Sequence, residues 1–259
     1  MRVPHWEALH RAWARLPAPP RVPAEVLGCV AAQIAEHPGS TLALGATAGL
    51  GEVAPAVTTL DASETLARRG ASSRRTIVGD WLRLPFADGA FATCVGDGCL
   101  NALPYPCHVA SLLRSVGGVL RPGGRFVCRV FLAPDVAETC AEVAAAALAG
   151  RIRRFQALKF RLGMAITAEA GDPNVAVSTI HDVFETRLAD RRHLAEVTGW
   201  NRDEIDTIDV YRSSAQVYSF PTRSQCLAAI PPEFRNARFV TAGTYELAER
   251  CPLLVADRS

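Results

Sequence analysis

The segment Thr41-Leu-Ala-Leu-Gly-Ala-Thr-Ala-Gly-Leu-Gly51 joins a short apolar run to a turn rich in glycine and alanine. Such a run followed at once by glycines is typical of a buried strand that ends in a turn before the next element. Glycine accepts positive φ angles and leaves room for a ligand close to the backbone. We therefore predict a first strand over residues 41–44 and a turn over residues 45–51.

The same pattern recurs downstream. Further strands are predicted over residues 57–60, 76–78, 91–95 and 125–132, and helices over residues 63–69 and 107–120. The tight turn Arg121-Pro-Gly-Gly124 leads into the last of these strands, because proline presets φ and glycine supplies a positive φ. Short apolar strands that alternate with helices are the signature of βαβ units, so we expect a parallel sheet.

The chain upstream of this region has the pattern of an amphipathic helix. Four apolar residues recur at a spacing of three and four residues: Trp6, Leu9, Trp13 and Leu16. The proline-rich residues 17–23 end this helix, and a second helix is expected over residues 24–36. We interpret residues 1–37 as a helical arm whose two tryptophans either anchor it on the core or cover a cofactor as a lid.

Beyond Pro134 the pattern becomes mainly helical. Helices are predicted over residues 136–149, 151–163 and 178–198, with a looser segment over residues 169–174. Strand-like sequence returns over residues 205–211, 216–220, 238–245 and 253–256. We expect the last two of these to pair antiparallel at the edge of the sheet.

Together these elements predict an α/β fold. The expected architecture is a Rossmann-like, doubly wound and mostly parallel sheet of seven strands with an antiparallel C-terminal edge, an N-terminal helical arm and a helical cap inserted after the fifth strand. We divide the chain into the arm or lid (1–37), a cofactor-binding core (38–134), the cap insertion (135–204) and C-terminal strands that complete the sheet (205–259).

Composition limits the partners of the chain. Its 259 residues, 49% of them hydrophobic, suffice for one large α/β domain, and 28 basic against 26 acidic residues give a formal net charge of +2. No basic block is dense enough for a nucleic-acid footprint. The most apolar stretch, residues 136–148, is interrupted by Glu138 and Glu142 and is too short to span a bilayer. We therefore expect neither nucleic acid nor a membrane as partner.

The eight cysteines point to a reducing environment. They form no C-x-x-C pair and have no nearby His-x-His partner, so no metal site is predicted. Free cysteines are usually buried, and we expect most of these to be. The N-terminus lacks the apolar region of a secretory signal. A cytoplasmic location is therefore predicted.

Candidate binding residues follow directly after the predicted strands. In an open parallel sheet, ligands bind beyond the carboxyl ends of the strands, where this chain has Gly45, Asp61, Asp80 and Asp97. The turn at Gly45 leads to a helix N-terminus that offers N–H groups to an anion. Asp61 can accept both hydroxyls of a ribose, and Asp80 can accept from an adenine amino group beside the ring of Trp81. The constellation predicts a nucleoside-containing cofactor, although each residue alone could be a turn glycine, a helix cap or a core side chain.

These segments resemble the class I S-adenosylmethionine-dependent methyltransferases, in particular a bacterial group of small-molecule or uncharacterised type. The matching stretches are residues 42–49, 57–63, 77–86, 95–105 and 120–127. Their order and spacing are more specific than any one of them. The resemblance extends to the tryptophan-rich arm and to Tyr245-Glu-Leu-Ala-Glu-Arg-Cys-Pro252.

The resemblance implies S-adenosylmethionine as cofactor. The glycine turn would line the methionyl part of the cofactor. Asp61 would bind its ribose and Asp80 its adenine, and Asp97 would face the methyl group that is transferred. The implied cofactor-binding residues are Gly45, Ala46, Thr47, Gly49, Asp61, Ala62, Asp80, Trp81, Asp97 and Gly98. The family usually has an acid two residues before the first glycine and a second glycine in the turn, where this chain has Ala43 and Thr47.

Catalysis by such an enzyme needs few side chains. Methyl transfer can proceed mainly because the acceptor is held in line with the methyl group, so no catalytic residue is obligatory. Where the acceptor must lose a proton, the candidate bases are His181, Tyr105 and His108. Candidate acceptor contacts are Asn101, Tyr105 and Tyr211, for which packing roles remain open.

The predicted function is methyl transfer from S-adenosylmethionine to a small-molecule acceptor, with a homodimer left open. Two alternatives remain at this stage. The first is a methyltransferase-like binding or assembly protein without transfer activity, which Ala43 and Thr47 would suit. The second and less favoured is an NAD(P)-dependent oxidoreductase, because Gly45, Gly49 and Gly51 lack the G-x-G-x-x-G spacing.

Overall fold

The computed structural model describes residues 3–12, 16–70 and 75–259. Its centre is a seven-stranded sheet in the order β3-β2-β1-β4-β5-β9-β8. The strands are β1 (Thr41–Leu44), β2 (Val57–Asp61), β3 (Arg75–Val78), β4 (Phe91–Asp97), β5 (Leu120–Arg129), β8 (Phe234–Val240) and β9 (Leu253–Arg258). Strands β1 to β5 are parallel, and β9 runs antiparallel between β5 and β8. The predicted Rossmann-like sheet with an antiparallel C-terminal edge is confirmed.

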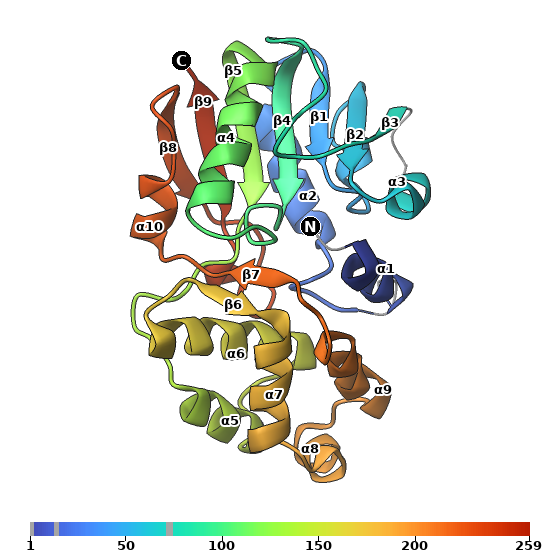
Figure 1. The fold of residues 1–259 in the computed structure, drawn as a ribbon, viewed down its shortest axis with the longest axis vertical. Coiled ribbons are helices and arrows are strands. Elements are labelled where there is room, and N and C mark those ends of the chain that lie inside the picture. Colours follow the sequence, from blue (N-terminus) through green and yellow to red (C-terminus); the bar gives the residue numbers. More distant parts are fainter. Residues whose placement is uncertain (1–2, 13–15, 71–74) are drawn as a thin grey trace.

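Helices cover both faces of this sheet, with α4 (Cys107–Val119) in front and α2 (Ala24–Ile34) behind it in Figure 1. The shorter α3 (Glu64–Gly70) lies beside β2 and β3. Helix α2 buries one apolar side chain per turn against the sheet, and the contact is formed by Val26, Val30, Ile34, Ala43, Val95 and Val127. Each fully buried side chain of this size contributes about 1.5–3 kcal/mol, so the repeat fixes which face of α2 packs inward.

A helical part is inserted between β5 and β8, as predicted. It contains α5 (Cys140–Leu148), α6 (Phe155–Ala170), α7 (Val177–Arg187), α8 (Arg191–Thr198), α9 (Arg202–Ile205) and the 3-10 helix η3 (Asp206–Tyr211). Helix α5 begins at Thr139, whose hydroxyl accepts a hydrogen bond from the backbone N–H of Glu142 in a capping box. Figure 1 shows this part facing the ends of β4 and β5, with a hairpin of β6 (Asn174–Ala176) and β7 (Val217–Ser219) at the junction. The short α10 (Arg223–Ala228) then leads to β8.

The structure corrects the prediction for residues 205–211, which are helical rather than a strand. Ile205, Ile208 and Tyr211 are the buried residues of this segment. They recur every third residue, which is the period of a 3-10 helix, whereas a half-buried strand would bury alternate residues. The buried residues of this segment therefore follow the three-residue period of a helix, and not the two-residue period of the predicted strand.

Further boundaries also differ from the prediction. Residues 216–220 contribute β7, but β7 pairs with β6 in the small hairpin and not with the main sheet. The helix expected over residues 178–198 is divided into α7 and α8, because the side chain of Asp190 accepts from the backbone N–H of His193 and starts a new helix. Residues 121–124 form an irregularity within β5 instead of a turn before it.

The N-terminal arm is a helix, α1 (Val3–Ala12), that lies beside α3 and η3. Leu9 belongs to the hydrophobic cluster formed by the helices of the inserted part. Trp6 packs against this cluster and also against the hydrophobic cluster on the α4 face of the sheet. The hydroxyl of Ser63 donates to Glu7 at 2.9 Å. Trp13, the third residue of the predicted apolar stripe, lies outside the described residues.

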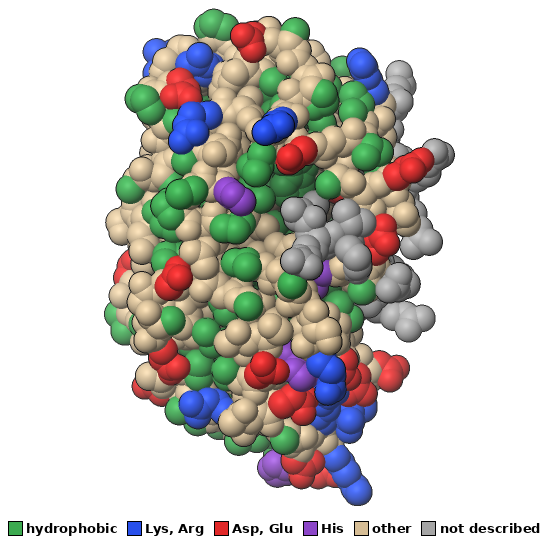
Figure 2. All heavy atoms as spheres, viewed as in Figure 1, with side chains coloured by type: hydrophobic (Ala, Val, Ile, Leu, Met, Phe, Trp, Pro, Cys, Tyr) green, Lys and Arg blue, Asp and Glu red, His purple; other side chains and the backbone are tan. Residues whose placement is uncertain are grey.

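Surface charge is mixed on the face that Figure 2 shows. Acidic and basic side chains are interspersed, most densely over the helical part, where they form ion pairs such as Arg192 with Glu196 and Arg202 with Asp206. None of the described helices has the length and apolar character needed to span a bilayer. Six of the eight cysteines are buried, and all are free, which confirms the expectation for most of them.

Candidate functional site

The register of the sheet brings three predicted residues together. Leu44 of β1 pairs with Leu60 of β2 on one side and with Gly96 of β4 on the other. The next residue, Gly45, therefore lies between Asp61 and Asp97 at the carboxyl ends of the strands. The strand order reverses between β1 and β4, and doubly wound sheets bind ligands at such a switch point.

A pocket of about 890 Å³, part of it open to solvent, lies at this point. One side, which we call the polar end, is lined by seven of the ten predicted cofactor residues: Gly45, Ala46, Thr47, Asp61, Trp81, Asp97 and Gly98. The other side, which we call the aromatic end, is lined by Trp6, Phe131, Phe160, Tyr211, Tyr218 and Phe220, together with Gln156 and Lys159.

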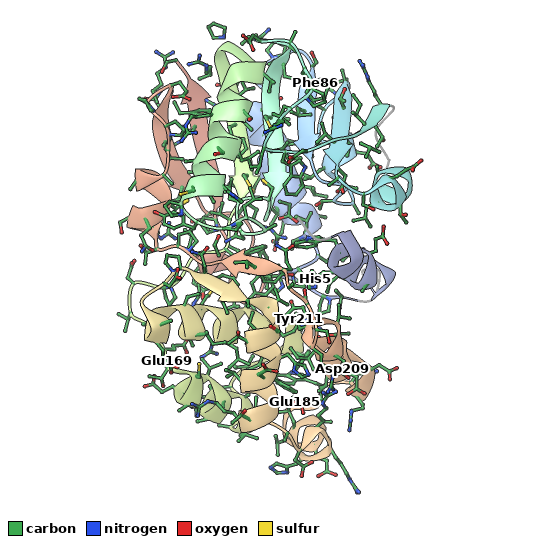
Figure 3. All side chains as sticks on the ribbon, viewed as in Figure 1. His5, Phe86, Glu169, Glu185, Asp209 and Tyr211 are labelled. Atoms are coloured by element: carbon green, nitrogen blue, oxygen red, sulfur yellow. The ribbon has the colours of Figure 1, made fainter. Side chains whose placement is uncertain are left out.

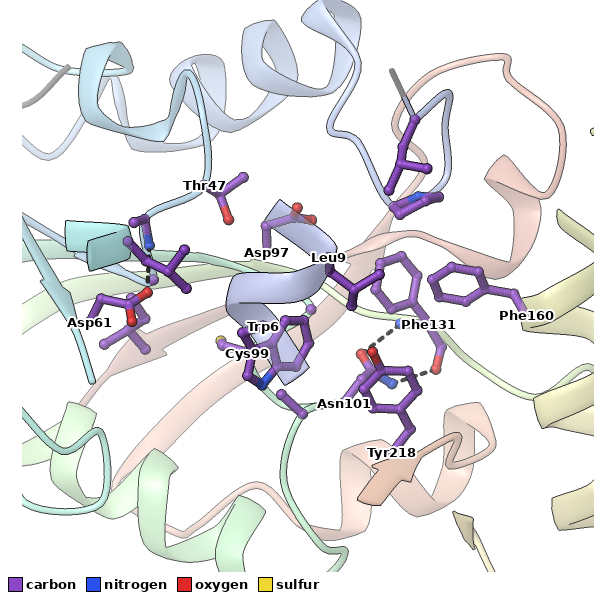
Figure 4. A pocket seen from close by; sticks show the side chains of 18 of the residues that line it. Trp6, Leu9, Thr47, Asp61, Asp97, Cys99, Asn101, Phe131, Phe160 and Tyr218 are labelled. Atoms are coloured by element: carbon purple, nitrogen blue, oxygen red, sulfur yellow. Dashed lines mark hydrogen bonds between the residues drawn. The ribbon is translucent and has the colours of Figure 1, made fainter. Parts of the chain in front are cut away.

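Figure 4 shows the two ends and the element that crosses them. Thr47 and Asp61 lie at one side of the view, and Phe131, Phe160 and Tyr218 lie at the other. Helix α1 passes across the pocket and carries Trp6 and Leu9 into its lining. The sequence left open whether the arm anchors on the core or covers a cofactor. Of the inserted part it indicated Tyr211, which lines the pocket, but not Gln156 or Lys159.

Asp61 is held rigidly at the polar end. Its Oδ2 accepts the backbone N–H of Ala46 at 2.9 Å, and its Oδ1 accepts that of Ser63 at 2.8 Å. The side chain is only 4% exposed. A carboxylate offers about four lone-pair positions, so about two remain for further donors. The group is therefore fixed in place and still able to accept hydrogen bonds from a ligand.

Replacement of Gly45 by a residue with a side chain would distort the pocket. Its φ angle is +91°, and a Cβ atom there would lie 3.2 Å from Cζ2 of Trp81. Trp81 cannot easily move aside, because its Nε1 donates to the backbone oxygen of Leu60 at 3.1 Å. A residue without a side chain is therefore required at this turn.

Asp97 forms a buried ion pair with Arg129, a residue that the sequence analysis did not single out. The two residues are direct neighbours on β4 and β5, and Nε and Nη2 of Arg129 donate to the two carboxylate oxygens at 2.5 and 3.1 Å. Burial raises the pKa of Asp97, and the guanidinium of Arg129 opposes that rise. An arginine at the end of an apolar strand, beside a strand that ends in aspartate, was the signal that could have indicated this pair.

Asn101 lines the pocket, but its amide is used in the fold. Its Nδ2 donates to the backbone oxygens of Phe131 and Ser219 at 2.7 and 2.6 Å, and its Oδ1 accepts the N–H of Phe131 at 2.9 Å. Figure 4 shows the bonds to Phe131. Both amide hydrogens are therefore committed to joining the loop after β4 to β5 and β7.

Three predicted cofactor residues do not line this pocket. Ala62 and Asp80 line a neighbouring cavity that shares Trp81 with the pocket, and the candidate base His108 lies there as well. The Oδ1 atom of Asp80 accepts the N–H of Leu82 at 3.0 Å. Gly49 has a φ angle of +87°, and a Cβ atom there would lie 2.4 Å from Cδ1 of Leu27 on α2.

The other two candidate bases also lie outside the pocket. The hydroxyl of Tyr105 donates to the backbone oxygen of Gln225 at 2.9 Å. His181 of α7 is buried, and its Nδ1 lies 3.1 Å from Asp182. Sequence spacing placed both residues on suitable elements but could not show which face of those elements meets the pocket.

His181 belongs to a cluster that could geometrically hold a cation, since its ring nitrogen and the carboxylates of Glu185 and Asp209 lie within 4.8 Å of one another. The guanidinium of Arg191, however, donates to both of those carboxylates and to Asp206. These contacts already compensate part of the negative charge of the acids. Figure 3 shows Glu185 and Asp209 within the helical part, whereas His5 and Tyr211 lie nearer its junction with the sheet.

Lys159, the only lysine of the chain, also lines the pocket and was not singled out from the sequence. It is 2% exposed on α6, and its Nζ lies 4.7 Å from the ring centroid of Tyr211. Its one hydrogen bond to a described residue is a long contact of 3.5 Å with the hydroxyl of Thr207. Burial lowers the pKa of Lys159 to about 7, against an opposing effect of Glu204.

The lowered pKa of Lys159 predicts how the free energy of unfolding changes with pH. Because the pKa of the folded state, about 7, lies below the ordinary value of 10.5, the unfolded chain binds more protons between these values. The free energy of unfolding should therefore rise with pH above about 7, by up to ~1.4 kcal/mol per pH unit. Denaturant unfolding of the wild-type protein and of Lys159→Met at several pH values measures this. The rise should be smaller in the variant, and equal slopes would contradict a neutral buried lysine.

Comparison with known proteins adds family information for part of the chain. Residues 39–128 match a family model described as a methyltransferase domain. No curated protein matches the chain.

Several solved structures resemble the whole chain. A Rhodobacter sphaeroides protein named as a zinc-dependent alcohol dehydrogenase has 13% identity and a TM-score of 0.60, over 100% of this chain and 99% of that chain. The N-methyltransferase NodS of Bradyrhizobium japonicum, in complex with S-adenosylhomocysteine, has 12% identity and a TM-score of 0.54, over 98% of each chain. The 1,6-didemethyltoxoflavin-N1-methyltransferase of Burkholderia thailandensis has 15% identity and a TM-score of 0.51, over 100% of this chain and 92% of that chain. At these identities the likeness shows the fold.

Proposed function

Because residues 39–128 carry a methyltransferase domain on a Rossmann-like sheet, we propose that this protein transfers a methyl group from S-adenosylmethionine to a small-molecule acceptor. The observation that carries the proposal is one pocket with two chemically different ends. The polar end lies at the switch point of the sheet, and the aromatic end lies under the inserted helices and α1. The described part of the chain thus offers adjoining places for a nucleoside and for an acceptor.

The residues of the polar end fit the cofactor. The remaining lone pairs of Asp61 suit the two hydroxyls of a ribose, and Gly45 lets a ligand approach the backbone beside it. Ala43 is fully buried in the core, so it takes no part in binding, and Thr47 and Asp97 are the polar side chains left to meet the methionyl group. When bound, S-adenosylmethionine supplies a sulfonium methyl group, whose carbon takes the electron pair of the acceptor while the carbon–sulfur pair returns to sulfur.

The chain itself contributes position and exclusion of water. The aromatic side chains and Leu9 of α1 form apolar walls around the acceptor place. Holding two reactants in a near-attack geometry lowers a barrier by up to roughly 7–11 kcal/mol in well-oriented systems. The same walls keep water from the reacting atoms, which strengthens the electrostatic interactions inside.

Calorimetric titration of the purified protein tests the proposal. S-adenosylmethionine and S-adenosylhomocysteine should bind with micromolar dissociation constants, and NAD should not bind. Binding of NAD alone would replace the proposal with a nicotinamide-dependent reaction. Binding of the sulfur nucleosides without transfer to any acceptor in a screen would favour a binding or assembly role instead, and binding of none of the three would refute the cofactor assignment.

A further inference from the structure

The aromatic end carries an inference about the acceptor that rests on the proposed function. We propose that it binds a planar aromatic molecule with an acidic hydroxyl group, and that Lys159 takes the proton of that hydroxyl. Lys159 would then be a catalytic residue that touches the acceptor, in place of the histidines and the tyrosine predicted from the sequence.

The walls of the aromatic end suit a flat ring. Six aromatic side chains line it, and they come from α1, α6, η3, β7 and the segments that follow β5 and β7. The centroids of Phe131 and Phe160 lie 4.6 Å apart, and those of Phe160 and Phe220 lie 6.1 Å apart, both in edge-on arrangements. Rings in such arrangements present faces and edges to a third ring, which gains aromatic contact beyond simple burial. A saturated acceptor would forgo this contact.

Three polar atoms in these walls lack close partners. Among the described residues, the buried Trp6 Nε1 and Gln156 Oε1 have no hydrogen-bond partner, and Lys159 Nζ has only the long contact with Thr207. Trp6 comes from α1, whereas Gln156 and Lys159 come from α6. A buried polar group without a partner costs about 1–3 kcal/mol. Two donors and one acceptor that line one pocket therefore indicate a polar ligand, and not an apolar one.

The surroundings of Lys159 suit a proton acceptor. No carboxylate of the described chain forms an ion pair with it, and the charged or titratable groups nearest to it are Glu204 of α9, His5 of α1 and Tyr211 of η3. Burial, and then the charge of Lys159, lowers the pKa of His5 to about 4, so His5 is neutral near pH 7. Burial raises the pKa values of Tyr211 and Glu204, which disfavours negative charge on both. Glu204 acts on Lys159 without forming an ion pair with it, so an incoming anion would be a direct partner of the amine.

Lys159 takes the proton before the methyl group is transferred. The O–H bond of the acceptor breaks and leaves its pair on oxygen, while the lone pair of Lys159 Nζ forms the new N–H bond. The oxygen then uses one pair to bond the methyl carbon described above, and the ammonium of Lys159 returns its proton to solvent. A base works best when its pKa lies near the working pH, and the pKa of about 7 for Lys159 meets that condition.

The test uses para-nitrophenol, a planar phenol whose phenolate form is coloured. The protein with S-adenosylhomocysteine bound is titrated with it, and the pKa of the bound phenol is read from absorbance across pH. The wild-type protein should lower that pKa by about one unit or more, because a cation within hydrogen-bond distance favours the phenolate. Lys159→Met should raise it above the solution value, since burial then acts alone, and Lys159→Arg should lower it again. Arg192→Met, which removes an exposed cation on α8, is the matched control and should behave as wild type.

The outcomes separate this inference from the proposed function. S-adenosylhomocysteine is titrated first, and failure to bind it would refute the cofactor assignment itself. If it binds and para-nitrophenol does not, the planar phenol site is refuted. If the phenol binds with the same pKa in the wild-type protein and in Lys159→Met, the role of Lys159 is refuted. Opposite shifts in those two proteins, with recovery in Lys159→Arg, would establish that the charge at residue 159 faces the acceptor.

Discussion

Replacement of Arg129 by methionine should lower the free energy of unfolding by about 3–5 kcal/mol. The substitution leaves Asp97 without its partner in a place with little contact with water, because the side chains of Arg129 and Asp97 are 1% and 5% exposed. Breaking a buried pair costs more than the pair contributes, since the remaining charge has no compensation. Guanidinium unfolding near pH 7, followed by circular dichroism, measures the change.

Two controls make the result specific. Arg192→Met removes an arginine whose pair with Glu196 is exposed, and such pairs contribute about 0–1 kcal/mol. The double variant Asp97→Asn/Arg129→Met removes both charges and should recover part of the loss. Because burial raises the pKa of Asp97, the loss in the single variant should also shrink as the pH falls and Asp97 becomes protonated. A loss as small as that of Arg192→Met would show that Asp97 is hydrated.

Asp61→Ala should weaken the binding of S-adenosylhomocysteine by on the order of a hundredfold to ten-thousandfold. A hydrogen bond to a charged group contributes about 1.5–3 kcal/mol, and the variant removes two such bonds to the ribose. It also frees the N–H groups of Ala46 and Ser63, which Asp61 holds in place. Calorimetric titration of the wild-type and variant proteins measures the change, and unchanged affinity would contradict the assignment of Asp61.

The matched control for this prediction is Asp80→Ala. Asp80 was predicted from the sequence as the adenine-binding acid, but it lines the neighbouring cavity and caps the N–H of Leu82. We expect its variant to bind S-adenosylhomocysteine as the wild-type protein does. Thermal unfolding of both variants separates a loss of affinity from a loss of folded protein. Equal weakening by both substitutions would return Asp80 to the cofactor site.

The sheet and its polar end could be predicted because they depend on local patterns. Each strand of the parallel sheet is a short apolar run followed by a turn residue, and such runs can be recognised without knowledge of the fold. Once the strands are taken as parallel, Gly45, Asp61 and Asp97 must meet at one edge, because parallel strands end on the same side. The errors at residues 205–211 and at β7 arose in the inserted part, where the apolar runs are short and fit the period of a helix as well as that of a strand.

The sequence by itself thus determined the order of the βα units, the place of the pocket and most residues of its polar end. Only the tertiary structure decided the aromatic end and the pairing of Asp97 with Arg129. Lys159 is far in sequence from Trp6 and Tyr211, and nothing in the local pattern around a lone lysine shows that α6 turns it inward. The physical reason is that burial, and with it the charge state of a side chain, depends on which elements pack together, whereas hydrophobic periodicity reports only the face that one element presents.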